Sequence, residues 1–201
     1  MIRVRRGIGL IETIVAMSIL VSAIVALMSM VISSATARSA NEYMTVAANL
    51  AREGVEAVVA ERNDNWINNL PFDTGMYVGT GAASDYTFEL SFNPATGVWT
   101  FDNTPNLITD AAAKMYKYTT ASSYPGLMVQ ASSQPANTTA TIYSRLITLD
   151  SICLDETVAT SGASCLPANY KIGVRVTSLV QWVDHAATHS ISVIETIYDW
   201  R

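Results

Sequence analysis

Residues 8–32 read IGLIETIVAMSILVSAIVALMSMVI and contain a single charged side chain, Glu12. Thirteen of these residues are Ile, Leu or Val. A helix needs about 20 apolar residues to cross the hydrocarbon core of a bilayer. The apolar side chains outweigh the cost of one carboxylate near the end of the run. The stretch therefore predicts a membrane-spanning helix.

Three basic residues, Arg3, Arg5 and Arg6, precede the apolar run. Basic residues that flank a membrane segment stay on the cytoplasmic side. We therefore expect the N-terminus in the cytoplasm and the C-terminal bulk of the chain outside it. A cleaved secretory signal fits poorly, because its apolar region is only about 7–15 residues long. An uncleaved signal anchor remains an alternative.

The composition of the whole chain narrows the class of protein. Half of the 201 residues are apolar, only 14% are charged, and the net charge is −5. Disordered chains have the opposite balance of low hydrophobicity and high charge. Nucleic-acid binding requires a basic surface, which an acidic chain disfavours. The length predicts one domain with an appendage.

The helical pattern continues beyond the apolar run. No proline occurs before Pro71, and Gly54 is the only glycine between Gly9 and residue 70. Small and apolar residues then recur at helical spacing with charges between them: Tyr43, Val46, Ala47, Leu50, Gly54, Ala57 and Val58. We expect one helix over residues 8–66, whose second half is amphipathic and packs on a soluble head.

Residues 67–201 change to a two-residue period, which indicates strands. Turn residues 93–97 separate two such runs and predict a hairpin. The predicted strands are 86–92, 98–101, 141–152, 172–182 and 190–198. Residues 103–139 are predicted to be largely irregular, with a short helix at 110–118. The fold class is therefore α+β: a long N-terminal helix packed on a C-terminal antiparallel β-sheet head.

Glu12 is unusual because a carboxylate inside a membrane segment is costly, and such a residue indicates a functional site by default. The stretch RRGIGLIE, from Arg5 to Glu12, resembles the class III signal of type IV prepilins. Ile8 and Gly9 stand where that family most often has Phe and Thr. The resemblance implies that a prepilin peptidase removes the leader 1–7, cuts after Gly7 and methylates the amine of Ile8. It also makes Glu12 the assembly glutamate, which pairs with a neighbouring Ile8 amine.

The resemblance implies a structural subunit of a type IV pilus-like filament, and it favours a minor pilin or pilin-like protein. The expected partners are the prepilin peptidase, other pilin subunits and, before assembly, inner-membrane lipid. The expected final location is a cell-surface filament. One alternative is a type II secretion pseudopilin. The other is a signal-anchored extracytoplasmic binding domain that does not polymerise.

Five small residues lie three or four positions apart on one face of the spanning segment: Ser18, Ser22, Ala26, Ser29 and Ser33. Small residues let membrane helices approach closely, and hydroxyls can form hydrogen bonds across them. We expect this face to be a helix-packing seam between subunits. Small residues are also common in spanning helices that have no such role.

The chain has two cysteines, Cys153 and Cys165, so only one intramolecular disulfide is possible. Outside the membrane such a pair favours a disulfide, with two free thiols or a metal pair as alternatives. Closing this loop contributes about 3 kcal/mol in the chain-entropy model.

Chemical motifs are otherwise scarce. His185 and His189 fall in a predicted turn and lack a third metal ligand other than Asp184. An acidic cluster near Cys153 lacks the spacing of a calcium loop and is predicted to be a solvated loop: Asp150, Asp155 and Glu156. No hydrolase, phosphate-loop, zinc-protease or dinucleotide motif is present. We therefore expect no catalytic activity, no cofactor, no metal and no nucleic-acid site.

Overall fold

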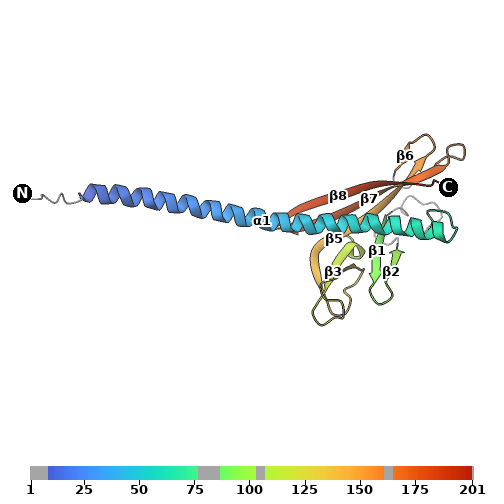
Figure 1. Ribbon diagram of the computed structural model, residues 1–201, viewed down its shortest axis with the longest axis horizontal. Helices are drawn as coiled ribbons and strands as arrows, with labels where there is room; N and C mark the ends of the chain where they lie inside the picture. Colours follow the sequence, from blue (N-terminus) through green and yellow to red (C-terminus); the bar gives the residue numbers. More distant parts are fainter. Residues whose placement is uncertain (1–8, 77–86, 103–106, 161–164, 201) are drawn as a thin grey trace, which may run out of the picture. The chain divides into compact units, whose positions relative to one another are not determined.

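The computed structural model describes residues 9–76, 87–102, 107–160 and 165–200. Two compact units make up the chain, Met1–Met44 and Thr45–Arg201. The second unit contains the sheet together with the second half of the long helix. It is an α+β arrangement of one helix and an antiparallel sheet (Figure 1), as the sequence predicts.

A single helix, α1, runs from Leu10 to Ile67. It ends where Asn69 adopts a positive φ of 59°. The amide of Asn69 then donates to the carbonyl of Trp66, and the amide of Leu70 donates to that of Asn65. These two bonds form a Schellman cap, and Pro71 just beyond it cannot continue a helix. The predicted end at residue 66 is thus confirmed to within one residue.

The second half of α1 has one buried face. Its buried residues are Ala47, Leu50, Ala51, Gly54, Val55, Ala57, Val58 and Asn65. Val55, Ala57 and Val58 belong to the same core cluster as Phe88 and Ile147 of the sheet. The amphipathic pattern predicted for this half is confirmed, because its apolar face is the one that the sheet covers.

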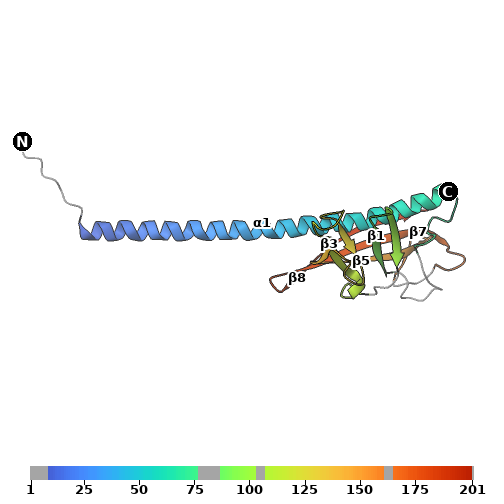
Figure 2. The same cartoon turned by 90° about the horizontal axis from the view of Figure 1, so that it is seen from below.

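Within the described residues the sheet contains eight strands, and every pair of neighbours is antiparallel. They are β1 (Thr87–Asn93), β2 (Val98–Asp102), β3 (Lys114–Tyr118), β4 (Met128–Gln130), β5 (Thr138–Cys153), β6 (Val158–Ala159), β7 (Lys171–Asp184) and β8 (Ala187–Tyr198). The long strand β5 is central. It pairs with β7 along one side and with β1, β3 and β6 along the other. Figure 2 shows the long strands lying alongside α1.

The strands predicted from residue alternation are confirmed as β1, β2, β5, β7 and β8. Tyr86, the first residue of the predicted hairpin, lies outside the described residues. Alternation succeeds here because one face of each strand is covered by α1 or by the core, so apolar and polar residues must alternate. The rings of Phe88 and Phe101 pack edge to face across the hairpin, with their centroids 5.2 Å apart.

The prediction of a short helix at residues 110–118 is wrong. Ala111–Ala113 form one 3₁₀ turn, and Lys114–Tyr118 are strand β3. This strand pairs with both β4 and β5, and it buries Met115 and Tyr116. Pairing with two distant strands outweighs a weak local helical preference. The connection over residues 103–139 therefore contains two strands that the sequence pattern did not indicate.

Candidate functional sites of the helix and the head

The first half of α1 is an uninterrupted apolar surface. All described residues from Gly9 to Glu42 are exposed in the isolated chain. They include Ile14, Leu20, Ile24 and Val31, each about half exposed or more. The helix is long and apolar enough to cross a membrane. Exposed apolar surface of this size marks a site of contact with a membrane or with another protein.

Glu12 lies in the first turn of α1 and is exposed. Its backbone amide and that of Thr13 donate to the carbonyl of Gly9, at 2.9 and 3.3 Å. A carboxylate in the first turn also interacts favourably with the positive end of the helix dipole. The predicted cleavage site, Gly7 and Ile8, lies outside the described residues, as do the rest of the leader and its three arginines.

The predicted seam residues are all in helical conformation and exposed: Ser18, Ser22, Ala26, Ser29 and Ser33. At about 100° per residue they fall within about 80° of the helix circumference. The Ser18 hydroxyl donates to the carbonyl of Ile14, and that of Ser22 donates to the carbonyl of Ser18, both at 2.8 Å. These bonds satisfy the hydroxyls inside the helix, so the face is compatible with an apolar environment.

The head is joined to the second half of α1 through Arg145, a residue on β5 that is only 1% exposed. Its guanidinium donates to the Glu53 carboxylate at 3.0 Å, the Leu50 carbonyl at 3.2 Å and the Leu90 carbonyl at 3.1 Å. Its Nε donates to Oε1 of Gln130 at 3.1 Å. One buried side chain thus connects α1, β1, β4 and β5.

This arginine is a fixed structural charge. Burial lowers the pKa of Arg145 below its ordinary value, while the charge and hydrogen bond of Glu53 oppose that shift. A guanidinium remains protonated at physiological pH despite such a shift. Its planar fork reaches several acceptors at once, which a lysine cannot do. Arg145 was not among the residues predicted from the sequence, although it is one of only two charges in the predicted strand 141–152.

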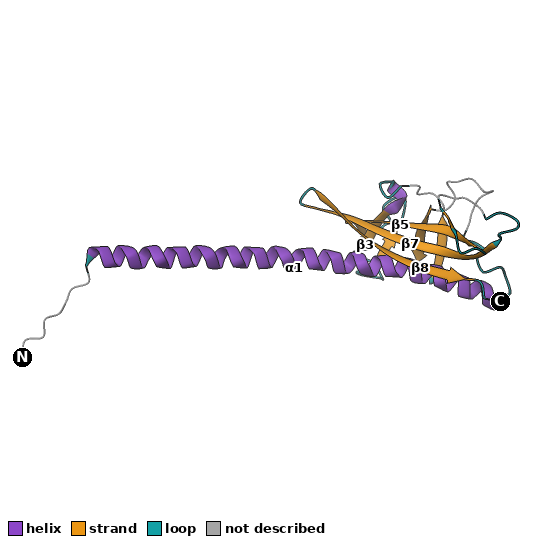
Figure 3. Ribbon diagram, turned by 90° about the horizontal axis from the view of Figure 1, so that it is seen from above, coloured by secondary structure: helices purple, strands orange, loops and turns teal. Residues whose placement is uncertain are grey.

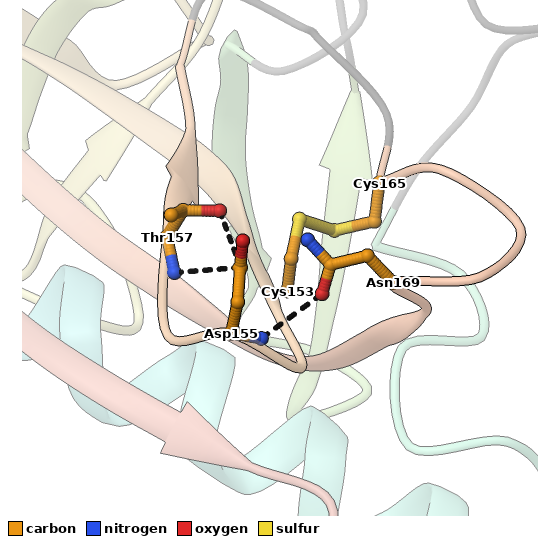
Figure 4. Close-up of a disulfide and its surroundings, with 5 residues drawn as sticks. All are labelled: Cys153, Asp155, Thr157, Cys165 and Asn169. Atoms are coloured by element: carbon orange, nitrogen blue, oxygen red, sulfur yellow. Dashed lines mark hydrogen bonds between the residues drawn. A yellow bond between two sulfur atoms is a disulfide. The ribbon is translucent and has the colours of Figure 1, made fainter.

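Cys153 and Cys165 form a disulfide with a Cα–Cα distance of 5.5 Å, so the predicted pairing is confirmed. Figure 4 shows the turn beside it. The Asp155 carboxylate accepts hydrogen bonds from the hydroxyl and amide of Thr157, at 2.6 and 3.1 Å. The side-chain oxygen of Asn169 accepts a hydrogen bond from the backbone amide of Asp155 at 2.9 Å. This bond connects the turn to the segment after Cys165. The hydrogen bonds that Thr157 donates to the carboxylate lower the pKa of Asp155, and the side chain of Asn169 adds to this shift.

The prediction of a solvated acidic loop is wrong for Asp150. This residue lies on β5, is 5% exposed, and forms an ion pair with Arg175 of β7 at 2.6 Å. Asp150 and Arg175 are directly opposite each other in the strand register, which brings the charges together. Asp155 and Glu156 are exposed, as predicted.

His185 lies in the turn between β7 and β8, as predicted, whereas His189 lies on strand β8, outside the turn. His185 and Ala186 both have positive φ, which is the conformation of a two-residue type I′ turn. Nδ1 of His185 lies 2.7 Å from a carboxylate oxygen of Asp184. The ring of His189 stacks on Trp182 with centroids 5.4 Å apart. Among the described residues, no three His, Cys, Asp or Glu side chains are grouped to hold a metal.

Comparisons of the chain with protein-family models, with curated proteins and with solved structures found no match. Function is therefore inferred from the residues of the chain itself.

Proposed function

We propose that the chain is a structural subunit of a type IV pilus-like filament. It is inserted in the inner membrane as a prepilin, with its N-terminus in the cytoplasm and its head outside. The leader 1–7 is then removed after Gly7, and the new subunit assembles through the apolar half of α1. A minor pilin or pilin-like subunit is the favoured member of this class.

One observation carries the proposal: the only charge in the apolar run 8–32 is Glu12, five residues after Gly7. In lipid this carboxylate is either protonated or an unpaired anion, and both states are costly. The amine that cleavage creates on Ile8 of a neighbouring subunit provides a countercharge. Pairing of the two groups favours one register between packed helices, which is what a regular filament requires.

Two further observations support the same reading. Helix α1 continues without a break from the apolar half into the half that packs on the sheet. A disulfide also closes a loop of the head, and disulfides persist in oxidising extracytoplasmic compartments. A type II secretion pseudopilin shares these features. A signal-anchored binding domain shares the spanning helix and the disulfide. Its function does not require a glutamate five residues after Gly7.

Mass spectrometry of the mature N-terminus tests the processing step. We expect N-methylated Ile8 when the chain is expressed with a prepilin peptidase. Gly7→Val should leave the leader in place, whereas Gly9→Ala, the matched change two residues later, should be processed normally. Recovery of intact Met1 from the unaltered chain would overturn the proposal.

Filament assembly is tested separately with Glu12→Gln. This variant should insert and be processed normally but should be lost from sheared surface filaments. Glu42→Gln, which changes the next carboxylate along α1, serves as the control and should be incorporated. Absence of the unaltered chain from every surface filament, with normal processing, would favour the pseudopilin.

A further inference from the structure

Arg38 is the first charged residue of the chain after Glu12. The residues between them, 13–37, carry no charge, and Figure 3 shows α1 as one unbroken helix. Basic side chains that end an apolar spanning segment lie where the hydrocarbon of the bilayer meets the lipid headgroups. Its position therefore makes Arg38 a candidate for contact with a headgroup.

The guanidinium of Arg38 is exposed and forms no ion pair or hydrogen bond with any residue that the structure describes. Glu42 lies one turn later, but an arginine that precedes a glutamate by four residues is the less favourable order for such a pair. The nearby hydroxyls of Thr36 and Ser39 donate to backbone carbonyls inside the helix, at 3.0 and 3.3 Å. The five N–H donors of Arg38 are therefore available to an acceptor outside the helix.

An open, shallow hollow on the surface of α1 lies beside Arg38, on the side of the apolar run. It is lined by Met30, Val31, Ser34, Ala35 and Arg38. Helix side chains lean towards the N-terminus, which places the stem of Arg38 over the turn of Ser34 and Ala35. These two small residues leave room there, and Met30 and Val31 are 72% and 68% exposed. The hollow thus has an apolar end and one cationic border.

We propose that Arg38 binds the phosphate of one phospholipid in the extracytoplasmic leaflet, and that an acyl chain of this lipid lies along the hollow beside Met30 and Val31. A guanidinium holds a phosphate through two parallel N–H···O bonds, which an ammonium group cannot form. The site combines a cation with an apolar surface. A lipid supplies the matching anion and apolar chain in one molecule, whereas a free phosphate ion supplies only the anion.

The length of the apolar run agrees with this position. The guanidinium lies near the level of Ser34, so the hydrocarbon core begins about one turn deeper, near Val31. The twenty residues from Glu12 to Val31 span about 30 Å at about 1.5 Å per residue. This length equals the thickness of the hydrocarbon core of a typical bilayer, about 30 Å. The contact therefore sets the depth of α1 and keeps Glu12 at the cytoplasmic boundary of the core.

This inference rests on the membrane insertion in the proposed function, but not on leader cleavage or filament assembly. It names the lipid contact of the inserted chain before assembly. Its test uses the full chain in bilayers without a prepilin peptidase. A failure of processing, seen as intact Met1, is therefore distinguishable from a failure of the lipid contact.

Solid-state NMR of the full chain in bilayers of phosphatidylglycerol tests the contact. Arginine is labelled with ¹³C at the guanidinium carbon, and the loss of carbon signal through coupling to ³¹P is measured in a buffer without phosphate. Lipid is then the only source of phosphorus, and the coupling reports contacts within a few ångströms. Arg38→Lys removes one of nine arginines and should lower the phosphorus-coupled signal by about one carbon. Arg52→Lys, the same change at the next arginine of α1, should leave it unchanged.

Two results of this experiment would overturn the proposal. One is an equal phosphorus-coupled signal in the unaltered chain and in Arg38→Lys, which would also be the result if Arg38 paired with a carboxylate of a second copy. The other is an Arg38 coupling that appears in bilayers of a phosphate-free glycolipid when inorganic phosphate is added. That result would assign the site to a free anion instead of a lipid.

A second pair of variants tests the hollow while leaving Arg38 in place. Ala35→Leu fills the hollow and should lower the Arg38 coupling at least twofold, because the lipid can no longer approach the guanidinium closely. Ala37→Leu adds the same side chain on the opposite side of the helix, about 200° away, and should leave the coupling unchanged. Equal coupling in the two leucine variants would refute the role of the hollow.

Discussion

A methyl group on Gly54 of α1 would lie 2.5 Å from the hydroxyl oxygen of Ser178 on β7. It would also lie 3.0 Å from Cδ1 of Ile147 on β5. Gly54 and Ser178 are both buried, and the Ser178 hydroxyl has no hydrogen-bond partner among the described residues. The distance between helix and sheet is thus set by the absence of a side chain at Gly54.

Gly54→Ala should destabilise the head. Overpacking costs about 1–3 kcal/mol, and the better helix propensity of alanine recovers up to about 1 kcal/mol. The free energy of unfolding is measured in detergent by tryptophan fluorescence, since all four tryptophans lie at or after Trp66. Gly9→Ala is the control, because a methyl group there meets nothing within 4 Å.

The same contact predicts that Ser178→Ala rescues Gly54→Ala. Removal of a buried hydroxyl without a partner should stabilise the unaltered head by about 1 kcal/mol. In the double variant it also relieves the clash, so the two effects should not add. Strictly additive free energies of unfolding would show that the two residues do not limit the helix–sheet distance.

Arg145→Met should cost about 3–5 kcal/mol, because it leaves buried acceptors on α1, β1 and β4 without their donor. Arg145→Lys should recover only part of this loss, since an ammonium group does not span the same acceptors. Glu53→Gln should cost less than about 1 kcal/mol, because Glu53 is 38% exposed. A stability of Arg145→Met close to that of the unaltered chain would contradict the central role of this residue.

Glu61→Gln should raise stability at neutral pH. Burial, with a contribution from Asp64, raises the pKa of Glu61 above its ordinary value of 4.5. The folded state therefore binds the proton more tightly than the unfolded state. Stability from this group is present below pH 4.5 and is lost as pH rises through the raised pKa. The gain from Glu61→Gln should appear above that window and vanish in denaturation curves below pH 4.5.

Replacement of both Cys153 and Cys165 by alanine should lower the free energy of unfolding by about 3 kcal/mol in the chain-entropy model. Reductant should destabilise the unaltered chain by a similar amount and leave the double variant unchanged. Equal mobility of reduced and non-reduced peptide maps would contradict the disulfide.

Ser22→Leu should lower filament yield without blocking membrane insertion, because a large side chain separates helices that approach through small residues. Ser34→Leu is the matched control, since residue 34 lies about 120° around the helix from the centre of the seam. The yields of both variants are compared in sheared filament fractions. Unchanged yield for Ser22→Leu would rule out the seam.

Several parts of the fold follow from local sequence. The apolar run 8–32 and the lack of breakers before Gly54 determine a long helix, and Asn69 with Pro71 determines its end. The strand containing Val174 and Val176 follows from alternation. The number of cysteines allows only one intramolecular disulfide, and the structure contains it. The helix and the strand depend on neighbours within a few residues, so their patterns can be recognised without the fold.

Other features were decided only by the tertiary structure. Lys114–Tyr118 became a strand because β4 and β5 pair with it. Asp150 is buried because the register of β5 and β7 sets it against Arg175. Arg145 finds acceptors on elements up to 95 residues away. Each of these outcomes depends on residues far apart in the chain, and local periodicity carries no information about which distant groups will meet.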